Sequence, residues 1–121
     1  METVMCGFVQ ADLVSSINSA TVVPDPGLVN PWGVVVNASY ACSSPLVKSV
    51  EASVVGPGGT ANGSTAPTCD SVSRTTDIQT TIVSGPVSPW AAGQQVEVAV
   101  KLVDANMQVV GSPLTQTMTL K

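Results

Sequence analysis

The stretch Trp32 to Cys42, WGVVVNASYAC, decides which secondary structure this chain favours. Alternate residues of the stretch differ in character, which is the period of two found in strands and not the 3.6 of helices. A strand built from it exposes small or polar residues such as Asn37 and Ser39 on one face. The opposite face is apolar and therefore faces a core: Trp32, Val34, Val36, Ala38, Tyr40 and Cys42.

The same alternation recurs along the chain and is interrupted by turn residues. Its clearest further examples are Val50 to Val54 and Val96 to Leu102. About seven short strands without helical periodicity are typical of a β-sandwich or a small barrel. One-sided alternation favours two packed sheets, so we expect an all-β fold, an immunoglobulin-like β-sandwich of about seven to eight strands. The other expected strands lie within residues 9–13, 19–23, 75–83, 107–110 and 114–120.

Length and composition agree with one domain. The chain has 121 residues, nine Pro and ten Gly, and valine dominates its apolar fraction. Residues 31–121 are expected to form the sandwich, and residues 1–30 an extended N-terminal arm or its first strands. The Gly-rich segment from Gly56 to Pro67, which contains Asn62, predicts a long flexible loop.

Charge excludes several classes of partner. The chain has four basic and eight acidic residues, and no basic residue precedes Lys48. Because nucleic-acid affinity depends on clustered Lys and Arg, no nucleic-acid partner is expected. No segment approaches the ~20 apolar residues of a membrane span. Met1 to Val14 lacks the basic start and the unbroken apolar run of a secretory signal.

Catalytic chemistry finds little support in the residues. Histidine is absent, which excludes the usual nucleophile–histidine arrangements and the commonest metal ligand. The spacing of the aspartates brings no two of them together, and three lie at turns, where Asp bonds its own backbone. We therefore expect no enzyme, no cofactor and no metal. The aspartates considered are Asp25, Asp70, Asp77 and Asp104.

Three cysteines leave an odd one over: Cys6, Cys42 and Cys69. Cys42 and Cys69 each stand beside a strand signal, which favours a disulfide between them. The alternative is three buried thiols, the usual state of a free cysteine.

Several segments resemble a group of small secreted actinobacterial proteins of unassigned function. The resemblance covers residues 32–120 and includes Tyr40-Ala41-Cys42, the Gly-rich loop, Thr68-Cys69-Asp70, the Ala92-Gly93 corner and the Val96 to Leu102 strand. It implies that Cys42 and Cys69 form a disulfide, and it implies no catalytic residue. The chain departs from that group over its first thirty or so residues, where it has extended sequence in place of a signal peptide.

Two functional hypotheses follow, both for a non-enzymatic structural or binding module. The first is a phage virion protein, a capsid decoration or minor structural protein, whose arm contacts capsid subunits or a second copy of itself. The second is a secreted or cell-surface bacterial immunoglobulin-like domain that binds a protein or glycan. The candidate partner contacts are Trp90, in a proline-flanked corner, and Phe8 and Val9, in the arm.

Overall fold

A computed structural model describes residues 12–24, 32–57, 59–84 and 92–121. These ranges form seven strands and no helix, which confirms the predicted all-β class. No helix long and apolar enough to cross a bilayer is found in them. In chain order the strands are β2 (Leu13–Pro24), β3 (Trp32–Ala41), β4 (Ser49–Gly56), β5 (Gly59–Thr65), β6 (Arg74–Ser84), β7 (Gln95–Val103) and β8 (Val109–Thr119).

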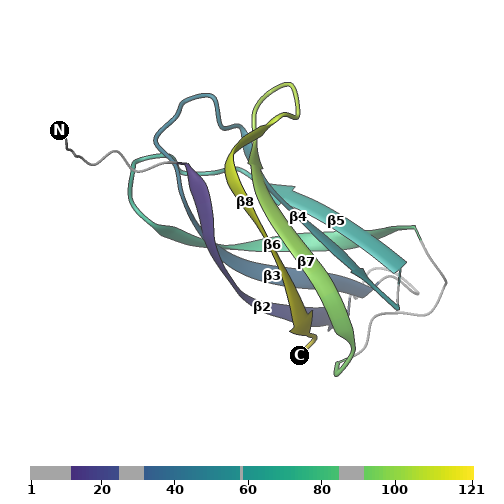
Figure 1. The fold of residues 1–121 in the computed structure, drawn as a ribbon. Helices are drawn as coiled ribbons and strands as arrows, with labels where there is room; N and C mark the ends of the chain where they lie inside the picture. The colour runs from purple at the N-terminus through teal and green to yellow at the C-terminus, as the bar shows by residue number, and fades with distance from the viewer. Residues whose placement is uncertain (1–11, 25–31, 58, 85–91) are drawn as a thin grey trace.

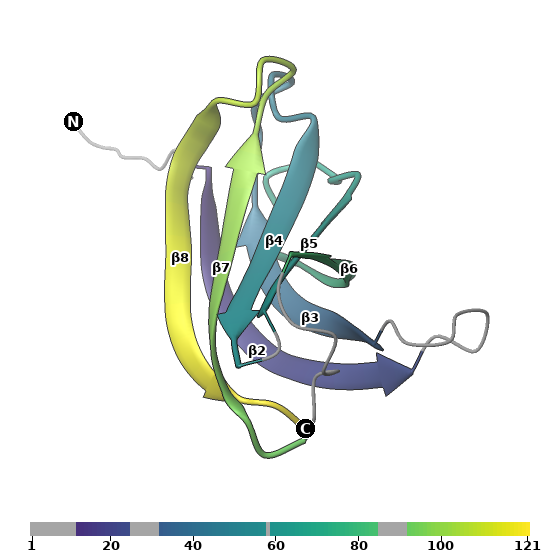
Figure 2. The same ribbon diagram turned by 90° about the vertical axis from the view of Figure 1, so that its right-hand side faces the viewer.

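The strands pair in a ring, in the order β2-β3-β6-β5-β4-β7-β8, and β8 returns to β2 (Figures 1 and 2). Neighbours are antiparallel except at the return, where Leu13 and Ser112 form a single parallel pair. The β5–β6 seam is also short and involves only Thr60 to Asn62 on β5. Long ladders therefore connect β2-β3-β6 and β5-β4-β7-β8, and short seams join these two groups.

Closure of the ring depends on Gly111, beside a bulge in the β7–β8 ladder. Gly111 has a φ of 74°, and a Cβ there would lie 1.8 Å from the carbonyl oxygen of Asp12. The backbone N–H of Ser112 donates to the same oxygen over 3.1 Å. Alternation in a sequence predicts which face of a strand is buried, not where two edge strands meet. The sequence therefore predicted two packed sheets and missed the closure, and the structure shows a closed barrel of seven strands.

The core is aliphatic and occupies the interior of the barrel. β3, β4 and β7 bury alternate residues, as the sequence predicted. Thr80 is the one fully buried polar side chain among the described residues, and its hydroxyl donates to the Val34 carbonyl over 2.7 Å. That bond removes the penalty of an unpaired buried hydroxyl. The largest buried side chains besides Thr80 are Ile78, Leu102, Leu120, Val34, Val36, Val50, Val54, Val98, Val100, Val103 and Cys42.

The prediction of a long loop from Gly56 to Pro67 is wrong. Gly59–Thr65 is strand β5, which pairs with β4 in a hairpin whose last pair is Gly56 with Gly59. Asn62 therefore lies on a strand and not in a loop. The sequence pattern missed β5 because Ala61 is its one fully buried residue. Such a strand carries almost no hydrophobic alternation.

The expected N-terminal segment, residues 1–30, is described only in part. Leu13–Pro24 is β2, which pairs with β3 along its length and buries Val14, Ile17 and Ala20. This part of the segment belongs to the barrel wall. Residues 1–11 and 25–31 lie outside the described ranges.

Candidate functional site

Three loops lie at one end of the barrel: residues 42–48, 66–73 and 104–108. They come together because β3, β5 and β7 all run toward that end (Figures 1 and 2). The first loop contacts the second loop and the end of β7, since Ser71 N–H donates to Cys42 O over 2.9 Å and Lys48 N–H donates to Val103 O over 2.8 Å. We call this surface the loop end.

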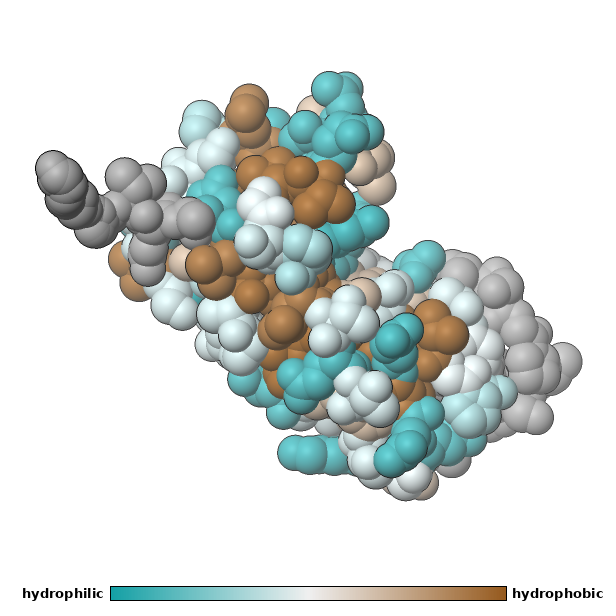
Figure 3. Space-filling model, in the orientation of Figure 1, coloured by the Kyte–Doolittle hydropathy of each residue, from teal (hydrophilic) through white to brown (hydrophobic). Residues whose placement is uncertain are grey.

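The loop end carries exposed apolar side chains. Leu46 is 65% exposed, Val72 54%, Met107 62% and Val109, the first residue of β8, 47%. The fifth large exposed apolar residue among those described is Val55, which lies at the other end of β4. Figure 3 shows hydrophobic surface over the upper end of β8, with hydrophilic side chains around it. Several exposed apolar groups at one end of a molecule favour an interaction surface there, whereas a single scattered one does not.

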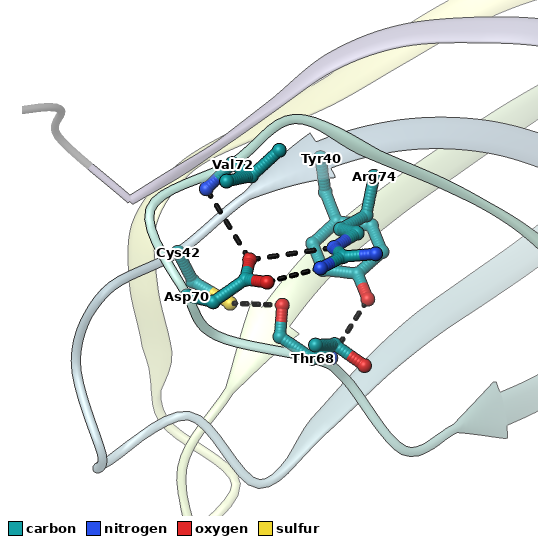
Figure 4. A network of polar contacts seen from close by, with 6 residues as sticks. All are labelled: Tyr40, Cys42, Thr68, Asp70, Val72 and Arg74. Atoms are coloured by element: carbon teal, nitrogen blue, oxygen red, sulfur yellow. Dashed lines mark hydrogen bonds and ion pairs between the residues drawn. The ribbon is translucent and has the colours of Figure 1, made fainter.

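A disulfide between Cys42 and Cys69 ties the first two loops together. It confirms the predicted pairing, and it joins the end of β3 to the segment that precedes β6. Buried Tyr40 adds a second tie, because its hydroxyl accepts the Thr68 backbone N–H over 2.9 Å (Figure 4).

Beyond the disulfide, an ion pair between Asp70 and Arg74 shapes the second loop (Figure 4). The same carboxylate accepts the Val72 backbone N–H over 3.3 Å. The hydrogen bond from Arg74 holds the pKa of Asp70 below its ordinary value of 3.8, and it raises the pKa of Arg74. Ser71, next to the exposed Val72, has a φ of 64°. The loop backbone is thus held in one uncommon conformation beside an apolar tip.

The third loop is organised by Asp104. One of its carboxylate oxygens accepts the backbone N–H of Asn106 over 2.8 Å and that of Gln108 over 3.0 Å. Its carbonyl accepts the N–H of Met107 over 3.1 Å. Met107 itself has a φ of 64°, which is rare for a long side chain. Strained backbone held by several bonds is often found at functional sites.

The two aspartates of the loop end are engaged in its own structure. Asp70 and Asp104 each bond within their own loop. Across the described ranges, no three His, Cys, Asp or Glu side chains are placed to hold a metal ion. The arrangement can present apolar side chains in fixed positions.

The outer faces of the barrel carry mainly polar side chains, and they differ in whether these side chains bond to one another. On β2, β3 and β6 the polar side chains bond to one another: Asn18 donates to Asn37 over 2.9 Å, and Asn37 donates to Asp77 over 2.7 Å. Ser39 and Thr75 share a further bond of 2.9 Å. These side chains therefore satisfy much of their hydrogen-bonding capacity within the face.

Across β5, β4 and β7, the outer face contains a hollow of about 350 Å³. Its polar side chains form no hydrogen bond or ion pair with each other in the described part of the chain. They are Glu51, Ser53, Asn62, Ser64 and Lys101.

The three candidate partner contacts chosen from the sequence, Phe8, Val9 and Trp90, lie outside the described residues. The apolar tips of the loop end were not selected from the sequence. Met107 was expected to begin a strand, but it lies in the turn before β8. The available signal was an apolar residue placed directly within turn chemistry, as in Ser44-Pro45-Leu46 and Asp104-Ala105-Asn106-Met107.

Comparisons with protein-family models, with curated proteins and with solved structures find no match for this chain.

Proposed function

We propose that this chain is a non-enzymatic, immunoglobulin-like module that docks on a protein partner through its loop end. The observation that carries the proposal is that apolar side chains are placed on three adjacent loops with tied backbones. Leu46, Val72 and Met107 represent one loop each.

The pairing supports the immunoglobulin-like assignment. The two short seams divide the ring into β2-β3-β6 and β5-β4-β7-β8, two groups of antiparallel strands that would face each other as in a sandwich. Immunoglobulin variable domains bind through loops at one end of such a sandwich. The disulfide departs from the antibody pattern, because it joins β3 to the segment before its neighbour β6 and not one sheet to the other.

Fixed loops favour binding for a physical reason. Ordering a loop on association costs free energy, and a loop that is already ordered avoids that cost. The disulfide, the Asp70–Arg74 pair and the Asp104 bonds supply this order before any partner arrives. The apolar tips would then contribute mainly through burial, about 25 cal/mol per Å² of apolar surface before the costs of association.

For the setting we propose a virion, where the module would decorate or join a capsid, with capsid subunits or a second copy as partner. A charge-poor surface rich in Ser and Thr suits such an assembly. The alternative setting is a secreted or cell-surface bacterial domain. The disulfide supports this alternative, because disulfides persist outside the reducing cytosol.

Density-gradient sedimentation of native material, with the protein followed by an antibody, separates the two settings. Comigration with intact particles supports the virion. Recovery only as a free species contradicts it and leaves the secreted domain.

The docking surface is tested by a pull-down with the natural particles or cell fraction as bait. The double variant Leu46→Ser/Met107→Ser should bind at least about tenfold more weakly, since it removes two central apolar contacts. Val55→Ser is the matched control, because Val55 is similarly exposed, at 48%, at the opposite end. Equal loss in the control, or no loss in the double variant, would contradict docking through the loop end.

A further inference from the structure

The hollow over β4 differs from the bonded polar groups on β2, β3 and β6 in how its own polar groups are used. On β2, β3 and β6, Asn and Ser side chains bond to their cross-strand neighbours. In the hollow, side chains of the same kinds stand on directly paired positions, Ser53 opposite Asn62 and Glu51 opposite Ser64, and make no such bonds in the described part of the chain. Its donors and acceptors are therefore open to an external molecule.

The hollow is large enough to hold a small molecule. Its volume of about 350 Å³ lies at the lower end of the range for ligand sites, about 300–1,000 Å³. Glu51, Ser53 and Lys101 are only partly exposed although they point away from the core. This partial burial strengthens hydrogen bonds to a ligand relative to those on an open surface.

The chemistry of the lining indicates the ligand class. Glu51 offers acceptors, Lys101 offers donors, and the Ser hydroxyls and the Asn62 amide offer both. Glu51 and Lys101 face each other across β4 and β7, so the hollow carries no net charge. A ligand with one charge would meet attraction and repulsion together, whereas a neutral molecule with many hydroxyls can bond to every one of these groups. Hydrogen bonds to the two charged groups would be the strongest.

We propose that this hollow binds a neutral saccharide, one or two sugar units of a glycan, through polar contacts. Among the described residues, Ala99 is the one apolar side chain that the outer face contributes to the hollow, and no aromatic ring lines it. The binding is therefore weak, with a Kd of about 1–10 mM for a disaccharide. Because the hollow lies on the side of the barrel, it can be occupied while the loop end is engaged.

NMR amide shifts on the full chain test this site directly. The probes are maltose, cellobiose, lactose and chitobiose, with diglycine as a zwitterionic molecule of similar size. We expect saturable shifts in β4, β5 and β7 with at least one disaccharide and none with diglycine. Glu51→Ala and Asn62→Ala should each weaken binding about tenfold. Thr117→Ala, an exposed substitution on the outer face of β8, should leave it unchanged.

Two results would overturn the saccharide site. One is an absence of shifts at about 50 mM of every disaccharide, which is several times the expected Kd. The other is a response to diglycine that exceeds the response to the sugars, which would assign the hollow to a zwitterion bound between Glu51 and Lys101. Retained amide dispersion in each variant shows that a loss of binding is not a loss of folding.

Discussion

At Gly63, β5 passes so close to β6 that no side chain fits between them. A Cβ at this position would lie 2.1 Å from the carbonyl oxygen of Gln79, a backbone atom that cannot rotate away. Gly93 differs, because it has a φ of 94° but no atom within 4 Å of its added Cβ. Gly63 is thus required because a side chain would not fit, whereas Gly93 is favoured only because its backbone has a positive φ.

We predict that Gly63→Ala lowers the free energy of unfolding by about 2–4 kcal/mol, since the strand must move away from β6. Gly93→Ala should lower it by only about 1 kcal/mol, the cost of a left-handed conformation. Urea denaturation followed by circular dichroism measures both. Equal losses would show that the β5–β6 contact adapts easily.

Protonation of Asp70 is expected to weaken the bonds that hold the second loop of the loop end. Its pKa is lowered by the hydrogen bond from Arg74, so the folded state favours the charged carboxylate. The contribution to stability is present above the unfolded pKa and fades as the pH falls through the folded pKa. Both side chains are well exposed, so the effect is confined to the loop.

An NMR titration of the Asp70 carboxyl carbon should therefore give a midpoint below 3.8, the ordinary value. In Arg74→Gln the midpoint should return toward 3.8, because the charged donor is lost. The Val72 amide shift should follow the same titration in the native chain. A midpoint that does not change in the variant would contradict the assigned cause.

At the scale of elements, the disulfide restrains the loop between β5 and β6. Cys42 and Cys69 are 27 residues apart, and the segment between them includes all of β4 and β5. Closing such a segment in the unfolded chain removes entropy worth about 3.5 kcal/mol in the chain-entropy model. The bridge therefore stabilises the fold and positions two of the three apolar loops.

We predict that Cys42→Ala/Cys69→Ala lowers the free energy of unfolding by about 3.5 kcal/mol. Reduction of the native chain should produce a similar loss, and the double variant should not respond to reductant. Denaturation curves with and without dithiothreitol provide the measurement. A response of the variant to reductant would assign the effect to Cys6, which lies outside the described residues.

At the scale of the whole molecule, β2 is the first strand of the ring that the structure describes. The first described contacts of the chain are those of Asp12, whose backbone carbonyl meets β8 and whose side chain accepts the Ser43 N–H over 2.9 Å. Val14, Ile17 and Ala20 follow in the core.

Deletion of Met1 to Gly7 should leave one cooperative thermal transition with little change in midpoint, and it should weaken assembly with a partner. Deletion through Ala20 should abolish the transition, because it removes three buried side chains and one wall of the barrel. Calorimetry tests both. Loss of cooperativity in the shorter deletion would show that the first residues form part of the core.

The sequence by itself determined the class of fold and most of its strands, and it favoured the disulfide pair over three buried thiols. Alternation is a local property, and Val34, Val36, Val98 and Val100 are buried as their spacing predicts. It also identified Asp104 as a turn residue, which bonds its own loop. Alternation and turn chemistry depend on neighbours in the chain and can be read from it.

Only the tertiary structure decided the closure at Gly111, the strand β5, the grouping of the apolar tips and the hollow over β4. Each depends on contacts between residues far apart in sequence, such as Gly63 with Gln79 and Ser71 with Cys42. Hydrophobic pattern records whether a residue is buried but not which distant segment covers it. Nothing in the sequence indicates that exposed Leu46 and Met107 lie at the same end of the molecule. The order and direction of the strands bring their loops together.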